Sequence, residues 1–419
     1  AQVYRQDAFS GCTDCSLDDI RLLLSSALEI IDHSIRANVR PDKLYHAYNL
    51  LDIDKDNAGV GRLYLMLEGQ VAALSSGAIG AEDAMNMLSA LFDSDVYRPD
   101  QKTFMLYPDR KLPGFMAKNR IPDERVTEIG LLVRMLEAGD TRLVYRDLDG
   151  NCRFNADFRN IADLDTRLSQ VTADFAAEVE RDRAALRTLY EDVFNHRAFT
   201  GRSGGMFGFE GLGCIYWHMV SKLLLAVQEI FFASLGHDSD RATTDALGKM
   251  YYRVREGIGF NKTPAEYGAF PTDPYSHTPK HAGAQQPGMT GQVKEEVLTR
   301  FGELGIRVEG GKVRFSPDLL RQQELISKPA QFCFLDVDGH WQDIAVPADG
   351  LAFTWCQVPI VYVLDDKKDE QVVLTMDDGK RVVLGTLHID SELSLELFQR
   401  SGRVRRINVS IRQRRLMSN

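Results

Sequence analysis

The spacing of apolar residues is the feature that most constrains the fold of this chain. In eight segments of the first three quarters of the sequence, apolar residues recur every three or four positions, as in helices that pack one face on a core. Ser16 and Asp19, at the start of the first segment, resemble a capping box, which marks a helix N-terminus. The predicted helices cover residues 16–38, 61–76, 81–93, 123–138, 163–195, 215–235, 240–257 and 290–304.

The loops between these helices are rich in Gly, Pro, Asp and Asn, and the longest loops also carry aromatic and charged residues. Helix pairs connected in this way predict a mainly α fold, an α/α toroid of helical hairpins whose loops build a central cleft. The predicted helices are too few for a complete ring. We therefore expect an incomplete toroid, or one whose first part lies before Ala1 in an N-terminal region of the same longer polypeptide.

The sequence pattern changes after Pro329. Short runs that alternate apolar and polar residues are separated by the turn signals DVDG, PADG, DDKKDE and MDDG, which is typical of antiparallel strands. These runs are 331–337, 351–363, 371–376 and 381–388, followed by the strand-like RINVSIRQ. We predict two domains, a helical domain of residues 1–328 and a small antiparallel, β-sandwich-like domain of residues 329–419.

Composition excludes some classes of partner. The chain has 419 residues, 44% of them hydrophobic, which suffices for a sizeable core. Its 50 basic and 60 acidic residues give a net charge of −10, which argues against a nucleic-acid partner. The N-terminus has no signal-peptide pattern, and no uninterrupted apolar run reaches the roughly 18 to 20 residues that span a bilayer. We expect no membrane partner and a cytoplasmic location.

Three patterns resemble metal sites but lack essential ligands. Cys12 and Cys15 form a CxxC without a second pair. His277 and His281 are four residues apart, but a proline between them precludes a regular helix. The segment LDIDKDNAG begins like a calcium loop, but it lacks the required glycine and the final glutamate, and we interpret it as a solvated turn between helices. We predict no metal.

The strongest local signal for chemistry is FTGRSGGMFGFEGLG, residues 199–213, just before the predicted helix 215–235. Its glycines let backbone N–H groups approach a ligand, and Arg202 and Ser203 suit a phosphate or a carboxylate. Glu210 lies among apolar residues, where burial raises a carboxyl pKa and suits the group to general acid catalysis. The alternative for the glycines is a flexible connecting loop in which they permit positive φ. The alternative for Glu210 is a carboxylate that caps the amides of the glycine loop.

Tyr216, Trp217 and His218 follow at the start of this helix. Flat aromatic rings match the apolar faces of a sugar ring, so we predict that these three residues bind substrate. The alternative, which the sequence leaves open, is a hydrogen-bonded histidine within an aromatic core.

Two long loops supply the other candidates. Residues 259–292 are rich in Pro and Gly, and we expect a cleft-lining lid there. The substrate-binding candidates on this lid are Asp273, Tyr275, His277 and Gln286.

The second loop, residues 96–119, carries Asp100 and Asp109. We predict both as catalytic carboxylates together with Glu210, because glycoside chemistry uses carboxylates placed across a cleft. Structural ion pairs with nearby arginines are the alternative for each aspartate.

Several strings together resemble a known superfamily, among them LYHAYNLL, YRPDQKTFMLYPDRKLPGFMAKN, FTGRSGGMFGFEGLGCIYWHMVSKLLLAVQE and FPTDPYSHTPKHAGAQQPGMTGQVKEE. They resemble the C-terminal half of large bacterial proteins of the six-hairpin glycosidase superfamily, loosely similar to cellobiose-phosphorylase-like enzymes. The resemblance implies an α/α toroid, a carbohydrate substrate and an appended β domain.

Thr200, Gly201 and Gly204 are similar to the Thr-Gly-x-x-Gly loop near the phosphate site of carbohydrate phosphorylases in that superfamily. The chain departs from those enzymes because it lacks the Asp-Trp-Asn-Asp string that bears their general acid. The resemblance therefore leaves open whether the glycosidic bond is cleaved by phosphate or by water.

These observations predict a carbohydrate-active enzyme, a glycoside hydrolase or phosphorylase, acting on a glycosidic bond of an oligosaccharide or polysaccharide. It needs no cofactor, and inorganic phosphate is the co-substrate in the phosphorolytic case. One alternative is a polysaccharide lyase on the same fold, which would abstract a proton beside a uronate carboxylate. The other is a non-catalytic glycan-binding or scaffold protein.

Overall fold

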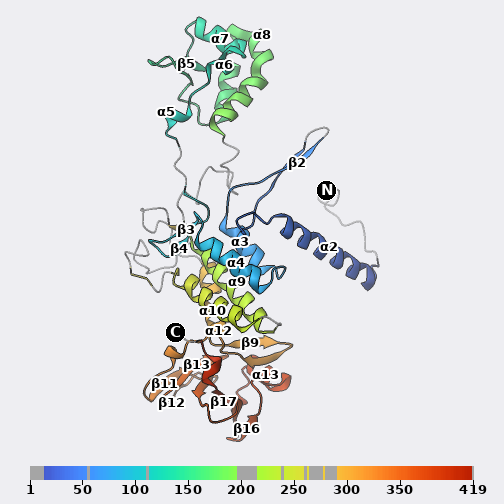
Figure 1. Ribbon diagram of the computed structural model, residues 1–419, viewed down its shortest axis with the longest axis vertical. Helices are drawn as coiled ribbons and strands as arrows, with labels where there is room; N and C mark the ends of the chain where they lie inside the picture. Colours follow the sequence, from blue (N-terminus) through green and yellow to red (C-terminus); the bar gives the residue numbers. More distant parts are fainter. Residues whose placement is uncertain are drawn as a thin grey trace. The chain divides into compact units, whose positions relative to one another are not determined.

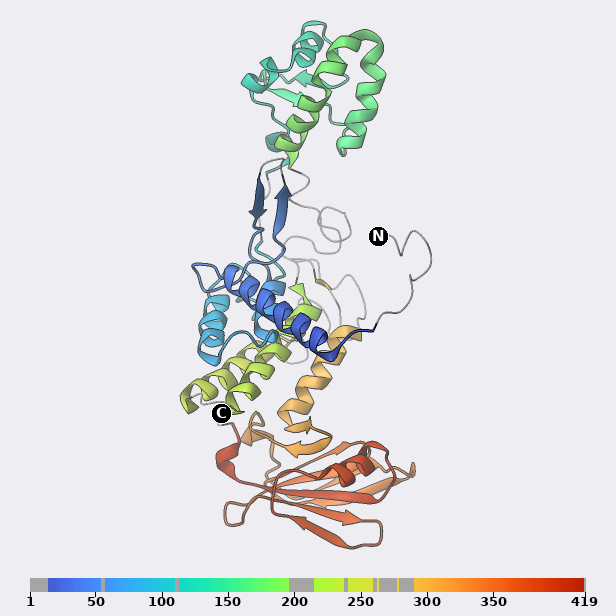
Figure 2. The same cartoon turned by 90° about the vertical axis from the view of Figure 1, so that its right-hand side faces the viewer.

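The computed structural model describes residues 14–53, 57–109, 113–195, 215–236, 240–258, 262–263, 277–278 and 290–417 (Figures 1 and 2). The chain forms two compact units. Unit 1 combines Ala1–Tyr107 with Ile215–Asn419, and unit 2 is Pro108–Cys214. Unit 2 is therefore inserted into the sequence of unit 1. The domain boundary predicted between residues 328 and 329 falls within unit 1 and stays a prediction.

The helical part of unit 1 is built around α9. Its helices are α2 (Leu17–Ala37), α3 (Leu67–Ser75), α4 (Ala81–Phe92), α9 (Trp217–Gly236), α10 (Arg241–Arg255) and α12 (Thr290–Glu303). Helices α3, α4, α10 and α12 all contact α9, which is apolar on most of its circumference, as expected of a core helix. Within the described ranges α9 alone is long and apolar enough to cross a membrane by length and composition, and 61% of its most apolar window is buried inside the protein.

Helix α2 shows the predicted capping box. The Ser16 hydroxyl accepts a hydrogen bond from the backbone N–H of Asp19 at 3.0 Å and donates one to its carboxylate at 2.7 Å. The predicted helix over residues 16–38 is thus confirmed, although none of its residues is buried by the described part of the chain. The calcium-like segment beside it is not a turn between helices but a hairpin of β1 (Leu50–Ile53) and β2 (Ala58–Gly61).

The C-terminal part of unit 1 contains a five-stranded sheet in the order β13-β14-β17-β15-β16. Its strands are β13 (Gly350–Trp355), β14 (Val358–Leu364), β15 (Gln371–Met376), β16 (Arg381–Leu384) and β17 (Val404–Ile411). The expected antiparallel pairing holds for every neighbour except β14 and β17, which are parallel. This exception arises because β17 returns through helix α13 (Ser391–Phe398) into the centre of the sheet.

Two hairpins accompany the five-stranded sheet. They are β9 (Ile306–Glu309) with β10 (Lys312–Phe315), and β11 (Ala330–Leu335) with β12 (Trp341–Val346). The five-stranded sheet shares a hydrophobic core with α13, the β9–β10 hairpin and Leu416, which follows the 3₁₀ turn η4 (Gln413–Arg415) after β17.

Unit 2 has a hydrophobic core of its own. It contains α5 (Phe115–Lys118), α6 (Asp123–Thr127), α7 (Gly130–Glu137), β5 (Val144–Arg146), β6 (Cys152–Phe154) and α8 (Ile161–Phe194). Helix α8 is interrupted at Phe175, whose φ is −134° and ψ is 39°. Asp165 forms ion pairs with Arg183 and Arg187, which would lie about 27 and 33 Å away along a straight helix. Helix α8 therefore folds back on itself as a helical hairpin.

Helices and small, mostly antiparallel sheets together give the chain a mixed α and β secondary structure. Each predicted helix is present in part or in full, with 123–138 divided into α6 and α7 at Ile129. The predicted 61–76 is wrong at its start, because the helix begins at Leu67, and the predicted 215–235 begins with the short strand β7. The described residues do not show an α/α toroid, and that part of the expected fold stays a prediction.

Candidate functional site

The structure describes only part of the predicted site. Glu210, Arg202, Ser203, Asp273, Tyr275 and Gln286 lie outside the described residues, and His277 is described only as part of a strand. Asp100, Tyr216, Trp217 and His218 are described within unit 1, whereas Asp109 is an exposed residue of unit 2. The candidate site is therefore built from the residues of unit 1.

A small hairpin carries Asp100. Its strands are β3 (Tyr97–Arg98) and β4 (Thr103–Phe104), and residues 99–102 form the turn. The rings of Tyr97 and Phe104 both pack on Phe92 of α4, with centroids 5.0 and 4.9 Å away. Edge-to-face packing of this kind adds about 0.5–1.5 kcal/mol per pair beyond area burial, so the hairpin is firmly anchored on the helical core.

Asp100 is held by a two-pronged ion pair. The guanidinium of Arg98 donates from Nη2 to Oδ2 of Asp100 at 2.6 Å and from Nε to Oδ1 at 3.2 Å. Arg98 is buried and Asp100 is exposed, and these hydrogen bonds lower the pKa of the Asp100 carboxyl. A lowered pKa keeps Asp100 ionised near neutral pH, which suits a base or an electrostatic role better than that of a general acid.

A second pair of short strands connects the start of α9 with the segment 259–292. Strand β7 (Ile215–Tyr216), which leads directly into α9, pairs with β8 (His277–Thr278), and Tyr216 lies opposite His277. The rings of Tyr216 and His218 are 5.6 Å apart, and both side chains are partly exposed. The structure therefore pairs residues 215–216, at the start of α9, with residues 277–278 of the segment 259–292, and the cleft-lining lid stays a prediction.

Lys262 connects these segments to the hairpin. Its ammonium donates to the backbone carbonyl of Gln101 in the β3–β4 turn and lies 5.1 Å from the centroid of the Trp217 ring. Trp217 is fully buried, so its indole packs in the core beneath Lys262 and has no open face for a sugar. Sequence reasoning missed Lys262, for which the only signal was a single cation in the lid segment GFNKTP.

Gly257 permits the close approach of α10 to this hairpin. A Cβ at Gly257 would lie 2.7 Å from the carbonyl oxygen of Lys102 and 3.1 Å from the hydroxyl of Thr103. Glycine thus lets the segment just after α10 rest directly against the end of the turn that carries Asp100 and Gln101. The arrangement places a cation, an ionised carboxylate and two partly exposed rings on elements that are fixed by the core.

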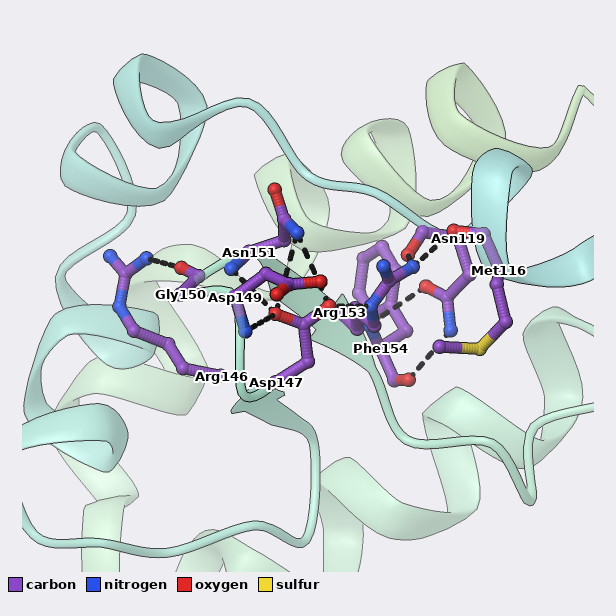
Figure 3. A network of polar contacts seen from close by, with 9 residues as sticks. All are labelled: Met116, Asn119, Arg146, Asp147, Asp149, Gly150, Asn151, Arg153 and Phe154. Atoms are coloured by element: carbon purple, nitrogen blue, oxygen red, sulfur yellow. Dashed lines mark hydrogen bonds and ion pairs between the residues drawn. The ribbon is translucent and has the colours of Figure 1, made fainter.

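Unit 2 contains a separate polar network around the β5–β6 hairpin (Figure 3). Oδ1 of Asp147 accepts hydrogen bonds from the backbone N–H groups of Asp149 and Asn151, at 3.0 and 2.9 Å. Its Oδ2 accepts one from Nε of Arg153 at 2.6 Å, and these contacts lower the pKa of Asp147 to about 2. The turn between β5 and β6 is therefore held by one ionised carboxylate.

The same arginine ties the hairpin to the segment before it. Arg153 donates from Nη1 to the backbone carbonyls of Met116 and Asn119 (Figure 3). The side-chain amide of Asn119 pairs with the backbone of Phe154, donating to its carbonyl at 2.8 Å and accepting from its N–H at 2.9 Å. Arg153, Asn119 and Phe154 are all buried, so this network holds the core of unit 2 together and exposes little to a ligand.

Residues 112–197 match the family model described as GH149 phosphorylase insertion domain 2. The matched range runs from α5 through α8 and so includes every described helix and strand of unit 2. A unit inserted into the sequence of another unit agrees with the description of an insertion domain. The match supports a carbohydrate-active phosphorylase or glycosidase family at this coarse level. No curated protein matches the sequence.

The six-hairpin superfamily and the cellobiose-phosphorylase-like enzymes stay resemblances of the sequence. The matched region covers about a fifth of the chain and contains none of the predicted site residues of unit 1. In the described part of the chain, no group of three His, Cys, Asp or Glu side chains is placed to hold a metal ion.

Proposed function

We propose that this chain is part of a glycoside phosphorylase, which cleaves a glycosidic bond of an oligosaccharide or polysaccharide with inorganic phosphate. The observation that carries the proposal is the match of the inserted unit 2 to a phosphorylase insertion domain. Asp100 in the β3–β4 turn, and Lys262, which contacts the Gln101 carbonyl of the same turn, support it. An α/α toroid, completed by an N-terminal region of the same longer polypeptide, is the scaffold that we propose for the catalytic cleft.

The chemistry requires an acid and a site for phosphate. A phosphate oxygen attacks the anomeric carbon while a general acid protonates the departing glycosidic oxygen, which yields a sugar 1-phosphate and a shortened glycan. We assign Glu210 as the acid, because the lowered pKa of Asp100 makes that carboxylate a poor proton donor.

The phosphate site that we propose combines Lys262 with Arg202 and Ser203. Lys262 is fixed between the Gln101 carbonyl and the Trp217 ring, so its position is defined before substrate arrives. Tyr216 and His218, the neighbours of Trp217 in the sequence, are partly exposed and would contact the sugar.

Other parts of the proposal follow from the same chemistry. The substrate is a carbohydrate, no cofactor or metal is required, and the protein acts in the cytoplasm. Neither a nucleic acid nor a membrane is a partner.

The experiment is turnover of an oligosaccharide panel with and without inorganic phosphate, for this chain and for any longer native form. Release of sugar 1-phosphate only in the presence of phosphate supports the proposal. Release of free sugar without phosphate would instead identify a glycoside hydrolase. An unsaturated uronide product would identify a lyase, and glycan binding without turnover by either form would identify a binding protein.

Lys262→Met tests the phosphate site directly. Charge-assisted contacts to an anion are worth several-fold to a hundredfold in binding, so we expect kcat/KM for phosphate to fall roughly tenfold to a hundredfold. Lys312→Met, at an exposed position on β10, is the matched control and should retain wild-type kinetics. Equal kinetics for both variants would remove Lys262 from the site.

A further inference from the structure

A cavity of about 480 Å³ lies in unit 1, between the end of α9, α10 and the 3₁₀ turn η4 (Gln413–Arg415) near the C-terminus. Its volume falls within the range of small-molecule sites. Ser234 of α9 lines it, and Ser234 follows Trp217 by 17 residues, about 25 Å along the helix. The cavity is therefore distinct from the candidate site at the start of α9.

Four cationic side chains line this cavity: Arg241, Lys249, Arg414 and Arg415. Lys249 and Arg414 are exposed, and neither forms an ion pair with another described residue. Arg241 has a loose, exposed ion pair with Asp245 at 4.0 Å, which contributes little to stability, and it donates a long hydrogen bond of 3.5 Å to the backbone carbonyl of Arg414. Three of the four cations are therefore available to an incoming anion.

The carboxylates of the cavity do not cancel this charge. Asp318 is paired with Arg415 at 3.2 Å, and Arg415 also makes a two-pronged contact with Glu370 at 2.8 and 2.9 Å. Arg415 is thus shared by two carboxylates, and Asp245 lies near Arg241. Four cations, Arg241, Lys249, Arg414 and Arg415, therefore face three carboxylates, Asp245, Asp318 and Glu370. This local excess of positive charge contrasts with the net charge of −10 for the whole chain.

The walls of the cavity are fixed by packing. Gly248 of α10 lies against Met417, because a Cβ at Gly248 would be 2.7 Å from the Met417 side chain. The backbone N–H of Met417 donates to the carbonyl of Leu320 at 2.9 Å. The segment that carries Arg414 is thus docked on α10, so little ordering of the chain is needed when a ligand binds.

We propose that this cavity binds a small phosphate monoester, such as a phosphorylated sugar. Lys249 and Arg414, which form no ion pair with a described residue, and the weakly paired Arg241 together suit a dianion. The volume exceeds that of a bare phosphate and leaves room for an attached polar group. This site is independent of the phosphate site proposed for catalysis.

The test measures binding to the whole protein by isothermal titration calorimetry. The two probes are a hexose 6-phosphate, whose phosphate is not on the anomeric carbon, and inorganic phosphate. The variant is Lys249→Met with Arg414→Gln. The matched control is Lys380→Met with Arg381→Gln, an exposed Lys-Arg pair at the start of β16. Thermal melting checks that both double variants are folded.

We expect the Lys249/Arg414 variant to bind hexose 6-phosphate at least roughly tenfold more weakly than the wild type and the control. The wild-type affinity should also fall as the salt concentration rises. Equal weakening of inorganic phosphate binding would show that the phosphate group alone is recognised, and weakening of the hexose ester alone that the sugar contributes. Unchanged binding in the folded variant, or no binding of either probe to the wild type, would overturn the proposal. Because the readout is binding, the result does not depend on turnover.

Discussion

Replacement of Asn119 by alanine tests whether the polar network holds unit 2 together. Asn119 is fully buried, and its amide makes two hydrogen bonds to the backbone of Phe154, which is also fully buried. Alanine removes both bonds and leaves an N–H and a C=O of Phe154 unpaired. An unsatisfied buried polar group costs about 1–3 kcal/mol, so we expect unit 2 to lose roughly 2–5 kcal/mol of unfolding free energy.

Asn155→Ala is the matched control for this prediction. The Asn155 amide also makes two hydrogen bonds, to the carbonyl of Thr141 and from the backbone N–H of Asp157, both at 3.0 Å. These bonds are exposed, so water can replace them in the variant. We expect this substitution to cost less than about 1 kcal/mol.

The assay is hydrogen exchange, detected by mass spectrometry, on peptides from α8 in the intact protein. A loss of about 3 kcal/mol would accelerate exchange of the protected α8 amides roughly a hundredfold. Trp217, Trp341 and Trp355 are the only tryptophans and all belong to unit 1, so their fluorescence during urea unfolding monitors unit 1 separately. Equal exchange in the two variants would refute the reasoning.

The remaining predictions concern a glycine of unit 1 and a carboxylate of unit 2. Gly305 has a φ of +77°, and a Cβ there would lie 2.4 Å from the backbone N of Pro317, so Gly305→Ala should cost at least about 2 kcal/mol in urea unfolding followed by tryptophan fluorescence. An unchanged midpoint would contradict this. The pKa of Asp147 is lowered to about 2 by Arg153, below the ~3.9 of an unfolded aspartate, so its stabilisation is present above pH ~4 and lost as the pH falls through about 2. Thermal melts followed by circular dichroism should show wild type more stable than Asp147→Asn near pH ~5 and equal to it near pH ~2; a difference that does not vary with pH would count against the ion pair.

The helices could be predicted because each one buries an apolar stripe, and the stripe is visible as a period in the sequence. The reversal of α8 at Phe175 could not be predicted from this period. Leu168, Val171, Phe175 and Val179 keep the helical spacing across the break, and all four are buried in the core of unit 2. Residues 172–178 contain neither Gly nor Pro, so no local signal marks the position where the helix folds back.

The strands show the same limit. The run 351–363 was predicted as one strand, whereas the structure has a hairpin of β13 and β14. Its turn is Cys356–Gln357, with φ values of +51° and +62°, a conformation that Gly and Asn usually supply. The central place of β17 depends on pairing with strands distant in sequence, which no local pattern reveals.

For the candidate site, residue types marked candidate segments but did not show which atoms meet. Tyr216, predicted at the start of the helix 215–235, lies opposite His277 of the predicted lid, in a pairing of β7 and β8 that no local pattern indicated. Asp100 forms an ion pair with Arg98, which was the alternative to its predicted catalytic role. Lys262 was missed because its contact with the Trp217 ring exists only in the tertiary structure.

The two points where unit 2 joins unit 1 belong to neighbouring parts of unit 1. The chain leaves unit 1 at Tyr107, three residues after β4 ends, and returns at Ile215, the first residue of β7. Strands β4 and β7 contact each other, and Phe104 and Ile215 are buried in the same core. The insertion therefore interrupts the sequence of unit 1 between two strands that pack together, as expected of a unit with a hydrophobic core of its own.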